Sequence, residues 1–349
     1  METEILSVMS DESISFAIPR AKEVILGGGL VVFPTETVYG LGADATNMHA
    51  AEKIYRAKAR PSDNPLIIHI ASPEDAEEYT YTCETYYALA RAFMPGPLTV
   101  ILPAKDTIPL TTRGGLETVA VRCPSNEVAR ALISACGVPI AAPSANLSGS
   151  PSPTVIKHVI DDMKERCDMI LDGGDCEFGL ESTIVQILDD QSLRVLRPGK
   201  ITPEDLQQIC PNVLIAKAVT EGLGENEAVL SPGMKYRHYA PAAPMFLLNG
   251  DSSKIIQYIR QEFKGRVAII AYHDEMCLYR EALPDATLYD FGKSGDEIEQ
   301  AHSLYYILRE ADKENYDTIY APMPSKEGIG LALYNRMIRA AAYQIIDLN

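Results

Sequence analysis

Two blocks of alternating strand-like and helix-like segments, joined by the eleven residues SPGMKYRHYAP (231–241), constrain the fold of this chain more than any other feature. In each block, short apolar runs alternate with stretches whose apolar residues recur at helical spacing, which is the pattern of α/β domains. A chain of 349 residues is also too long for most single hydrophobic cores. We therefore predict two α/β domains.

The first block has the pattern of a mixed α/β unit. Helical spacing covers 14–26, 50–59, 73–92 and 127–136, and the strand candidates are 30–34, 66–70, 98–102, 118–122, 140–142, 183–188 and 193–196. The polar residues 189–192 separate the last two strands, which predicts a hairpin. The glycines at 27–29 precede a strand rather than opening a helix, so they indicate a turn and not a phosphate cradle.

The second block alternates more regularly. Its strand candidates are 244–249, 267–272, 286–291 and 317–322, and its helical stretches are 253–263, 297–311 and the closing run 329–346. Such alternation predicts a parallel sheet with helices on its faces. Because the block has no glycine fingerprint, it gives no reason to expect a dinucleotide.

The net charge of −17 argues against tight general binding to nucleic acids or anionic membranes, since both need a basic surface. A phosphate site must therefore be a local concentration of cations. The first sixteen residues lack the features of a signal peptide, and no run reaches membrane-spanning length. The seven cysteines form no Cys-x-x-Cys pair, which indicates neither a disulfide framework nor a zinc site. We expect a cytoplasmic protein with reduced thiols.

One short segment concentrates positive charge. The run KIYRAKAR (53–60) places four cations in eight residues, and Pro61 then ends the helix. Lys53, Arg56 and Arg60 share one helix face, whereas Lys58 lies off it. A solvated helix face would explain this run, but cations at a helix end followed by SDNP also suit a triphosphate.

Polar residues also follow or end several strands. His69 lies in an apolar run, either as a core residue or as a participant in a site. Arg122 ends an apolar strand and needs an anionic partner, either an internal carboxylate or a substrate carboxylate. Thr35, Glu36 and Thr37 follow another strand and resemble the rim of a polar pocket.

Hydroxyl groups add to this pattern. The loop 143–152 is rich in serine and directly follows a strand, where open α/β sheets bind ligands. Ser182, Thr183 and Arg197 flank the predicted hairpin. No motif pairs a nucleophile with its base. We therefore expect a reaction whose nucleophile comes from the substrate, as in phosphoryl or nucleotidyl transfer.

Taken in order, seven motifs resemble the YrdC-type threonylcarbamoyl-AMP synthases. They are FPTETVYGLG (33–42), KARPSDNPLIIH (58–69), MPGPLTVIL (94–102), VAVRCP (119–124), APSANLSG (142–149), ESTIV (181–185) and VLRPG (195–199). The segment SPGMKYRHYAP and the smaller carboxyl-terminal block resemble the long, two-domain form of that family.

The resemblance implies a fold and a domain division. It implies a YrdC-like catalytic domain at 12–205 with a twisted mixed sheet and helices, and a linker at 206–243. A smaller Rossmann-like parallel α/β domain would occupy 244–349.

The resemblance also implies a reaction. L-Threonine and bicarbonate (or CO2) would form a carbamate whose oxygen attacks the α-phosphate of ATP, giving threonylcarbamoyl-AMP and pyrophosphate. Mg²⁺ is expected to accompany the ATP, because several negative charges must be neutralised. A tRNA-modifying threonylcarbamoyl transferase would then move the group to an adenosine beside the anticodon.

Site residues follow from the same resemblance, motif by motif. The implied threonine-binding residues are Thr35 or Thr37, His69, Arg122 and Ser182. The implied ATP-binding residues are Lys58, Arg60, Asn64, Thr118, Ser144, Asn146, Ser152, Arg197, Tyr236 and His238. The last two belong to the linker, which we interpret either as a spacer or as a lid over the phosphates.

Two other functions stay open from the sequence. A structured-RNA binding module without nucleotidyl transfer would use a concave basic patch, which the acidic total disfavours. A carbamoyl-transfer or hydrogenase-maturation enzyme could be built on the same amino-terminal fold. It should carry additional zinc-finger or acylphosphatase-like segments, and the cysteine spacing excludes the former.

Overall fold

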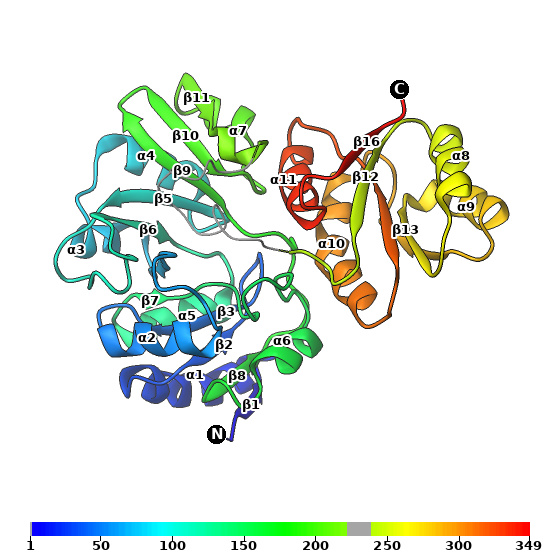
Figure 1. Ribbon diagram of the computed structural model, residues 1–349. Helices are drawn as coiled ribbons and strands as arrows, with labels where there is room; N and C mark the ends of the chain where they lie inside the picture. Colours follow the sequence, from blue (N-terminus) through cyan, green and yellow to red (C-terminus); the bar gives the residue numbers. More distant parts are fainter. Residues whose placement is uncertain (1, 222–238) are drawn as a thin grey trace. The chain divides into compact units, whose positions relative to one another are not determined.

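The computed structural model describes residues 2–221 and 239–349, which form two compact units (Figure 1). The first unit takes in the described residues up to Glu221, apart from Gly149–Pro151. The second takes in Gly149–Pro151 and the described residues from Tyr239 to Asn349. The range 206–243, predicted as a linker, contains regular structure in the first unit: β11 (Asn212–Ile215) and the short 3-10 helix η2 (Lys217–Val219).

An eleven-stranded mixed sheet forms the framework of the first unit. Its order is β1-β8-β2-β3-β7-β4-β6-β5-β9-β10-β11. The strands are β1 (Glu4–Ser7), β2 (Val31–Phe33), β3 (Gly40–Asp44), β4 (Ile67–His69), β5 (Leu98–Pro103), β6 (Thr118–Arg122), β7 (Ile140–Ala141), β8 (Met169–Asp172), β9 (Thr183–Asp189), β10 (Ser192–Arg197) and β11. The predicted hairpin is confirmed, because β9 and β10 pair antiparallel.

The helices of the first unit include those that the periodicity predicts over 14–26, 50–59 and 127–136, and two that it does not predict, at 156–163 and 203–207. The helices are α1 (Asp11–Leu26), α2 (Met48–Ala57), η1 (Pro73–Asp75), α3 (Ala76–Tyr79), α4 (Glu84–Phe93), α5 (Glu127–Cys136), α6 (Ile156–Met163) and α7 (Pro203–Gln207). The single helix predicted over 73–92 is wrong. Thr80 is extended and bridges to Ala104 beside β5, so the helix is divided between α3 and α4.

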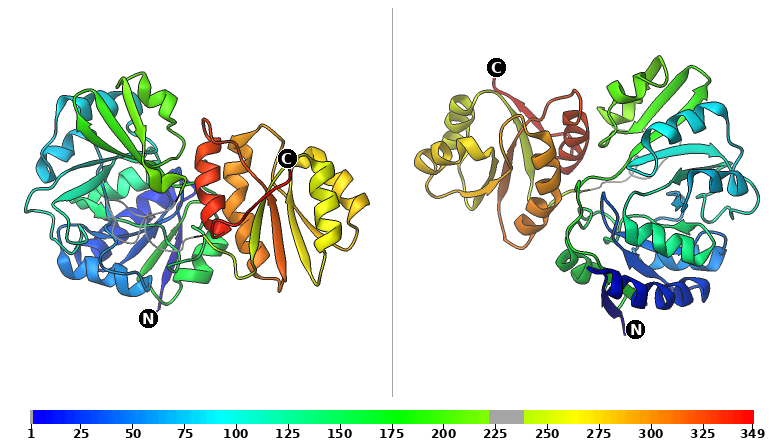
Figure 2. Two further views of the ribbon diagram at one scale, coloured as in Figure 1. Left: turned by 45° about the horizontal axis from the view of Figure 1, so that its top comes forward. Right: turned by 180° about the vertical axis from the view of Figure 1, so that it is seen from behind.

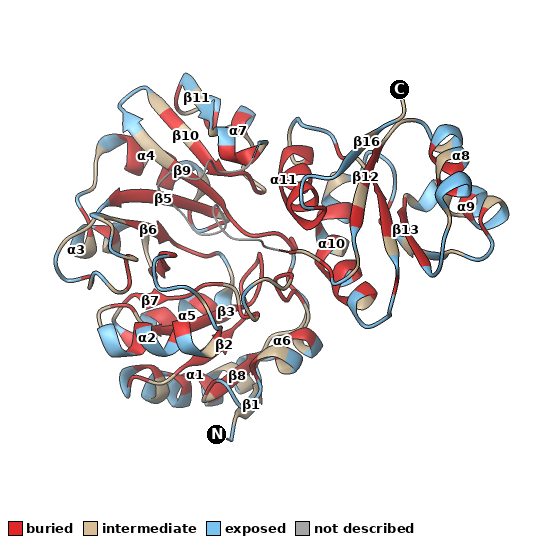
Figure 3. Cartoon of the chain, viewed as in Figure 1, coloured by how far each residue is buried: buried red, intermediate tan, exposed pale blue. Residues whose placement is uncertain are grey.

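The two faces of the central strands differ, and this difference positions the site. Alternate residues of β4, β6 and β5 (Ile68, Val121 and Val100) enter the main hydrophobic core. The opposite face carries a small apolar cluster that includes Ile67, Ala120, Ile101, Ile184 and Leu196. Figure 3 shows how strongly β5 and β6 are buried. Two residues beyond Ile67 and Ala120 on this second face come His69 and Arg122.

The second unit is a five-stranded sheet of order β14-β13-β15-β12-β16, parallel throughout as predicted. Its strands are β12 (Met245–Asn249), β13 (Val267–Ala271), β14 (Thr287–Asp290), β15 (Thr318–Pro322) and β16 (Ile345–Asp347). Helices α8 (Ser252–Glu262) and α9 (Met276–Ala282) cover one face, and α10 (Glu297–Asp312) and α11 (Gly330–Ala340) cover the other (Figure 2).

The closing helix is shorter than the periodicity over 329–346 predicts. After α11, Ala342 and Tyr343 adopt left-handed backbone angles (φ 48° and 63°), which end the helix. The chain then forms β16, whose residues pair with β12. Within the described residues, no helix has both the length and the apolar character needed to cross a bilayer.

Gly199 is a position where only a hydrogen side chain fits. A Cβ atom there would lie 2.6 Å from the Thr183 amide nitrogen and 2.7 Å from the Glu181 carbonyl oxygen. We expect Gly199→Ala to lower the free energy of unfolding by about 1–3 kcal/mol, because the backbone must shift to admit the methyl group. Urea denaturation followed by circular dichroism measures this. Lys200→Ala, at a partly exposed neighbour whose side chain makes a surface ion pair with Glu177, is the control, and equal midpoints for the two variants would contradict the expectation.

Candidate functional site

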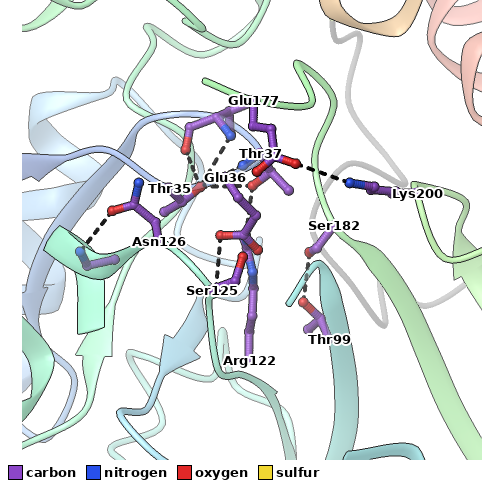
Figure 4. Close-up of polar contacts among 12 residues, drawn as sticks. Thr35, Glu36, Thr37, Thr99, Arg122, Ser125, Asn126, Glu177, Ser182 and Lys200 are labelled. Carbon is purple, nitrogen blue, oxygen red and sulfur yellow. Dashed lines mark hydrogen bonds and ion pairs between the residues drawn. The ribbon is translucent and has the colours of Figure 1, made fainter. Parts of the chain in front are cut away.

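Four polar side chains form a row across adjacent strands of the first sheet. His69 of β4 is in register with Arg122 of β6, and Arg122 is in register with Thr99 of β5. Register partners project from the same face of a sheet. Ser182, just before β9, continues the row, because its Oγ lies 2.8 Å from Thr99 Oγ1 (Figure 4). All four side chains are buried.

Arg122 is held by an internal carboxylate. Its Nη2 lies 2.6 Å from Glu36 Oε1 and donates to Thr37 Oγ1 at 2.9 Å. The Glu36 and Arg122 side chains are only 7% and 5% exposed, so the pair is largely removed from solvent. Arg122 Nε is buried and has no hydrogen-bond partner among the described residues. The guanidinium therefore has an internal partner and still has a donor for a second acceptor.

Backbone contacts hold Glu36 in place. The Ser125 amide donates to Glu36 Oε2 at 3.3 Å, and the amides of Phe178 and Gly179 donate to the carbonyls of Glu36 and Thr37. Both segments come from elsewhere in the chain. The position of this carboxylate is therefore set by tertiary structure.

Thr35 and Thr37 have different contacts, although the sequence does not separate them. Thr35 Oγ1 donates to the Val38 carbonyl at 2.6 Å and accepts from the amides of Thr37 and Val38. It therefore holds the turn. Thr37 Oγ1 contacts Arg122 directly, whereas Thr35 Oγ1 reaches the polar network of the row through Thr37 Oγ1, at 2.9 Å. Which of them contacts a substrate stays a prediction.

His69 is neutral in the folded protein. Burial, and then the positive charge of Arg122, lower its pKa from 6.5 to about 3. Its ring meets Phe33 edge-on at 6.2 Å between centroids, and its Nδ1 has no partner among the described residues. A neutral imidazole can bind a ligand through hydrogen bonds but does not add a charge at pH 7.

Lys58 ties the end of α2 to the hydroxyl-rich loop. Its buried ammonium group donates to the carbonyl oxygens of Ser144 and Asn146, and it lies 3.4 Å from Asn146 Oδ1. Ser144 Oγ in turn donates to Asn146 Oδ1. Three predicted ATP-binding residues are thus brought together. Lys53 donates instead to the Gly28 carbonyl oxygen. The helix face that Lys53 shares with Arg56 and Arg60 therefore does not contain the buried cation, which is Lys58.

The other predicted ATP-binding residues form two further groups. Arg60 donates to the carbonyl oxygens of Asn64 and Pro65 at 3.3 and 3.1 Å. Arg197 donates to the carbonyl and hydroxyl oxygens of Ser182 at 3.0 and 3.1 Å. A residue predicted to bind ATP thus contacts a residue predicted to bind threonine.

Ser152 and Thr118 complete the predicted set in the first unit. Ser152 Oγ donates to Glu181 Oε1 at 2.6 Å, and Thr118 begins β6. Tyr236 and His238 lie outside the described residues.

Two site residues were not assigned a role from the sequence. The sequence pattern indicates Glu36 only as part of a polar pocket rim, and it gives Thr99 no role. Thr99 is a polar residue within an apolar strand, the same signal that drew attention to His69. Only strand register shows that the two belong to one row. Among residues 2–221 and 239–349, no group of three His, Cys, Asp or Glu side chains could hold a metal ion.

The buried ion pair predicts a stability effect. We expect Glu36→Leu to destabilise the protein by about 3–5 kcal/mol, because it leaves Arg122 buried without its carboxylate. Glu4→Leu is the matched control, since it breaks the exposed pair with Arg20 in the same unit and should cost less than about 1 kcal/mol. Urea denaturation measures the free energy of unfolding of the two variants. Similar losses would show that the Glu36–Arg122 pair contributes no more to stability than an exposed ion pair.

His69 predicts a pH dependence. Its pKa is 6.5 in the unfolded chain and about 3 in the folded protein, so the unfolded state binds the extra proton between these values. Stability is therefore lost as pH falls from about 6.5 toward 3, by about 1.4 kcal/mol per pH unit. His69→Gln should reduce this slope between about pH 7 and about pH 5. An unchanged slope in His69→Gln would contradict a neutral, buried His69.

Comparison with known proteins accounts for both units. Residues 23–199 match the family model described as "Telomere recombination" (Sua5, YciO and YrdC proteins), and residues 201–342 match "Threonylcarbamoyl-AMP synthase, C-terminal domain". The threonylcarbamoyl-AMP synthases of Bacillus subtilis and Pyrococcus abyssi are 42% and 40% identical to this chain. Those alignments cover 94% and 92% of this chain, and 94% and 93% of the relatives.

A solved structure agrees over the same length. The crystal structure of P. abyssi Sua5 complexed with L-threonine is 37% identical, covers 100% of both chains and has a TM-score of 0.89. The mixed and parallel sheets described above thus have a full-length counterpart. This chain belongs to the threonylcarbamoyl-AMP synthase family.

Proposed function

We propose that this protein is an L-threonylcarbamoyladenylate synthase. The threonine amine adds to CO2, supplied as such or by bicarbonate, and loses a proton to give a carbamate. A carbamate oxygen then attacks the α-phosphorus of ATP, the bond between that phosphorus and the bridging oxygen to the β-phosphate breaks, and pyrophosphate leaves. Because the substrate supplies the nucleophile, the protein has to position reactants and stabilise charge.

The observation that carries this proposal is the row of His69, Arg122, Thr99 and Ser182 beside the apolar cluster of the same sheet face. In the proposed complex, Arg122 binds the threonine carboxylate through the donors that Glu36 and Thr37 do not use, while Nη2 keeps its contact with Glu36. His69 and Ser182 supply neutral hydrogen-bonding groups. A neutral His69 suits this position, because a second cation would compete with Arg122 for the same carboxylate.

The ATP side of the proposal uses cations at the ends of structural elements. Lys58, Arg60 and Arg197 would hold the nucleotide and its phosphates with Asn64 and Thr118. Ser144, Asn146 and Ser152 would add neutral donors from the hydroxyl-rich loop. Mg²⁺ would arrive with ATP and neutralise phosphate charge, with no cluster of protein ligands needed.

The product implies a later step. Threonylcarbamoyl-AMP is a mixed anhydride, so we propose that a partner transferase passes its threonylcarbamoyl group to an adenosine beside the anticodon of tRNA. A structured-RNA binding module without nucleotidyl transfer is not favoured, because relatives that match nearly the whole chain are named as synthases.

Substrate dependence tests the proposal. Pyrophosphate release from ATP should require both threonine and bicarbonate, as measured by a coupled pyrophosphate assay. Release that proceeds equally without threonine would show that the proposed substrate is wrong.

Arg122→Ala separates the two substrates in the same assay. It should raise the KM for threonine far more than the KM for ATP, since of the two substrates the guanidinium contacts only the amino acid in this proposal. Equal losses for both substrates would indicate a structural arginine. Exposed Arg91→Ala provides a control for the loss of one positive charge.

A further inference from the structure

Arg113 is a buried cation that the proposed function has not used. It lies in the connection between β5 and β6 and is only 6% exposed. A guanidinium stays protonated at any physiological pH, so its charge cannot be removed by a pKa shift. A buried charge is costly unless a counter-charge or hydrogen bonds compensate it.

Arg113 differs from Arg122 and Arg197 in having no such compensation. Arg122 pairs with Glu36, and Arg197 donates to Ser182. Within the part of the chain that the structure describes, the side chain of Arg113 forms no hydrogen bond or ion pair, and its Nε is fully buried. Its two terminal nitrogens are not among the enclosed atoms, so an anion can approach them.

The loop that carries Arg113 lies directly against a predicted ATP-binding segment. The Leu66 amide donates to the Thr112 carbonyl at 3.0 Å. On the other side of Arg113, a Cβ on Gly114 would be 3.0 Å from the Pro65 nitrogen and 3.2 Å from the Asp63 carbonyl oxygen. The residues on both sides of Arg113 therefore contact the segment 63–66.

The Arg60 guanidinium contacts the same segment, which also carries a buried polar atom without a hydrogen-bond partner among the described residues. Arg60 donates to the carbonyls of Asn64 and Pro65. Asn64 is 1% exposed, and its Oδ1 has no partner among the described residues. The segment 63–66 thus contacts Arg60, carries the buried Asn64 amide and packs against the loop that holds Arg113.

We infer that Arg113 is a phosphate-binding residue: with Arg60 and Asn64 it forms a subsite for the polyphosphate of ATP and for the pyrophosphate product. This inference rests on the proposed function. The ligand is an anion, because the buried guanidinium of Arg113 has no counter-charge among the described residues and an anionic ligand would supply one.

Arg113→Met tests the inference, because it keeps an unbranched side chain and removes the charge. The apparent KM for ATP and the Kd for inorganic pyrophosphate should each rise about tenfold or more, and the KM for threonine should change less than about twofold. Arg113→Lys should restore part of the loss. Arg91→Met, at an exposed arginine of α4, is the matched control and should behave as wild type.

The Tm of Arg113→Met distinguishes a ligand-binding role from a structural role. Loss of a structural arginine would lower the Tm of the protein without ligand. Without ligand, Arg113→Met should unfold at the same temperature as wild type or a higher one, since an uncompensated buried charge has been removed. Inorganic pyrophosphate should raise the Tm of wild type and of Arg91→Met, but raise that of Arg113→Met much less.

Three results would overturn the inference, and they differ from a failure of the proposed function. Wild-type affinity for ATP and pyrophosphate in Arg113→Met would show that Arg113 is not a ligand. A lower Tm without ligand, with equal losses for threonine and ATP, would show a structural role. If wild type neither binds pyrophosphate nor releases it in a threonine-dependent reaction, both the inference and the proposed function fail.

Discussion

The buried ion pair between Glu36 and Arg122 is the interaction on which the candidate site depends. Arg122 stands in the middle of the row formed by His69, Thr99 and Ser182. Its charge lowers the pKa of His69, and its Nη2 orients Thr37. Without the Glu36 carboxylate, the guanidinium would be desolvated with no counter-charge. The pair therefore allows a cation to be placed inside the sheet before any substrate arrives.

The geometry of this pair also explains how one arginine can serve both fold and ligand. A guanidinium has five N–H donors in a fixed plane, and Glu36 and Thr37 both use Nη2. Nε remains without a partner among the described residues. An internal carboxylate thus holds the group in one orientation while leaving a donor for a second acceptor. A flexible lysine could not be held in this way, because its donors rotate about a single nitrogen.

The arrangement of cations reconciles an acidic protein with an anionic substrate. The chain has a net charge of −17, yet Lys58, Arg113, Arg122 and Arg197 are all buried in the first unit. Lys58 and Arg197 donate to backbone carbonyl oxygens, and Arg122 pairs with Glu36. Positively charged side chains are therefore concentrated inside the first unit of a protein whose net charge is negative.

The sequence alone determined the two-unit α/β organisation, most strand positions and the order of the motifs, because periodicity and turn residues are local properties. β6, for example, covers the predicted 118–122, and α5 covers 127–136. Local pattern failed where a long-range contact decided the outcome: Thr80 bridges to Ala104, and β16 pairs with β12. Only the tertiary structure decided that Glu36 is the carboxylate of Arg122, that Thr99 joins the row, and that the loop carrying Arg113 packs against 63–66. Those contacts depend on strand register and loop packing between residues far apart in the chain, which no local pattern encodes.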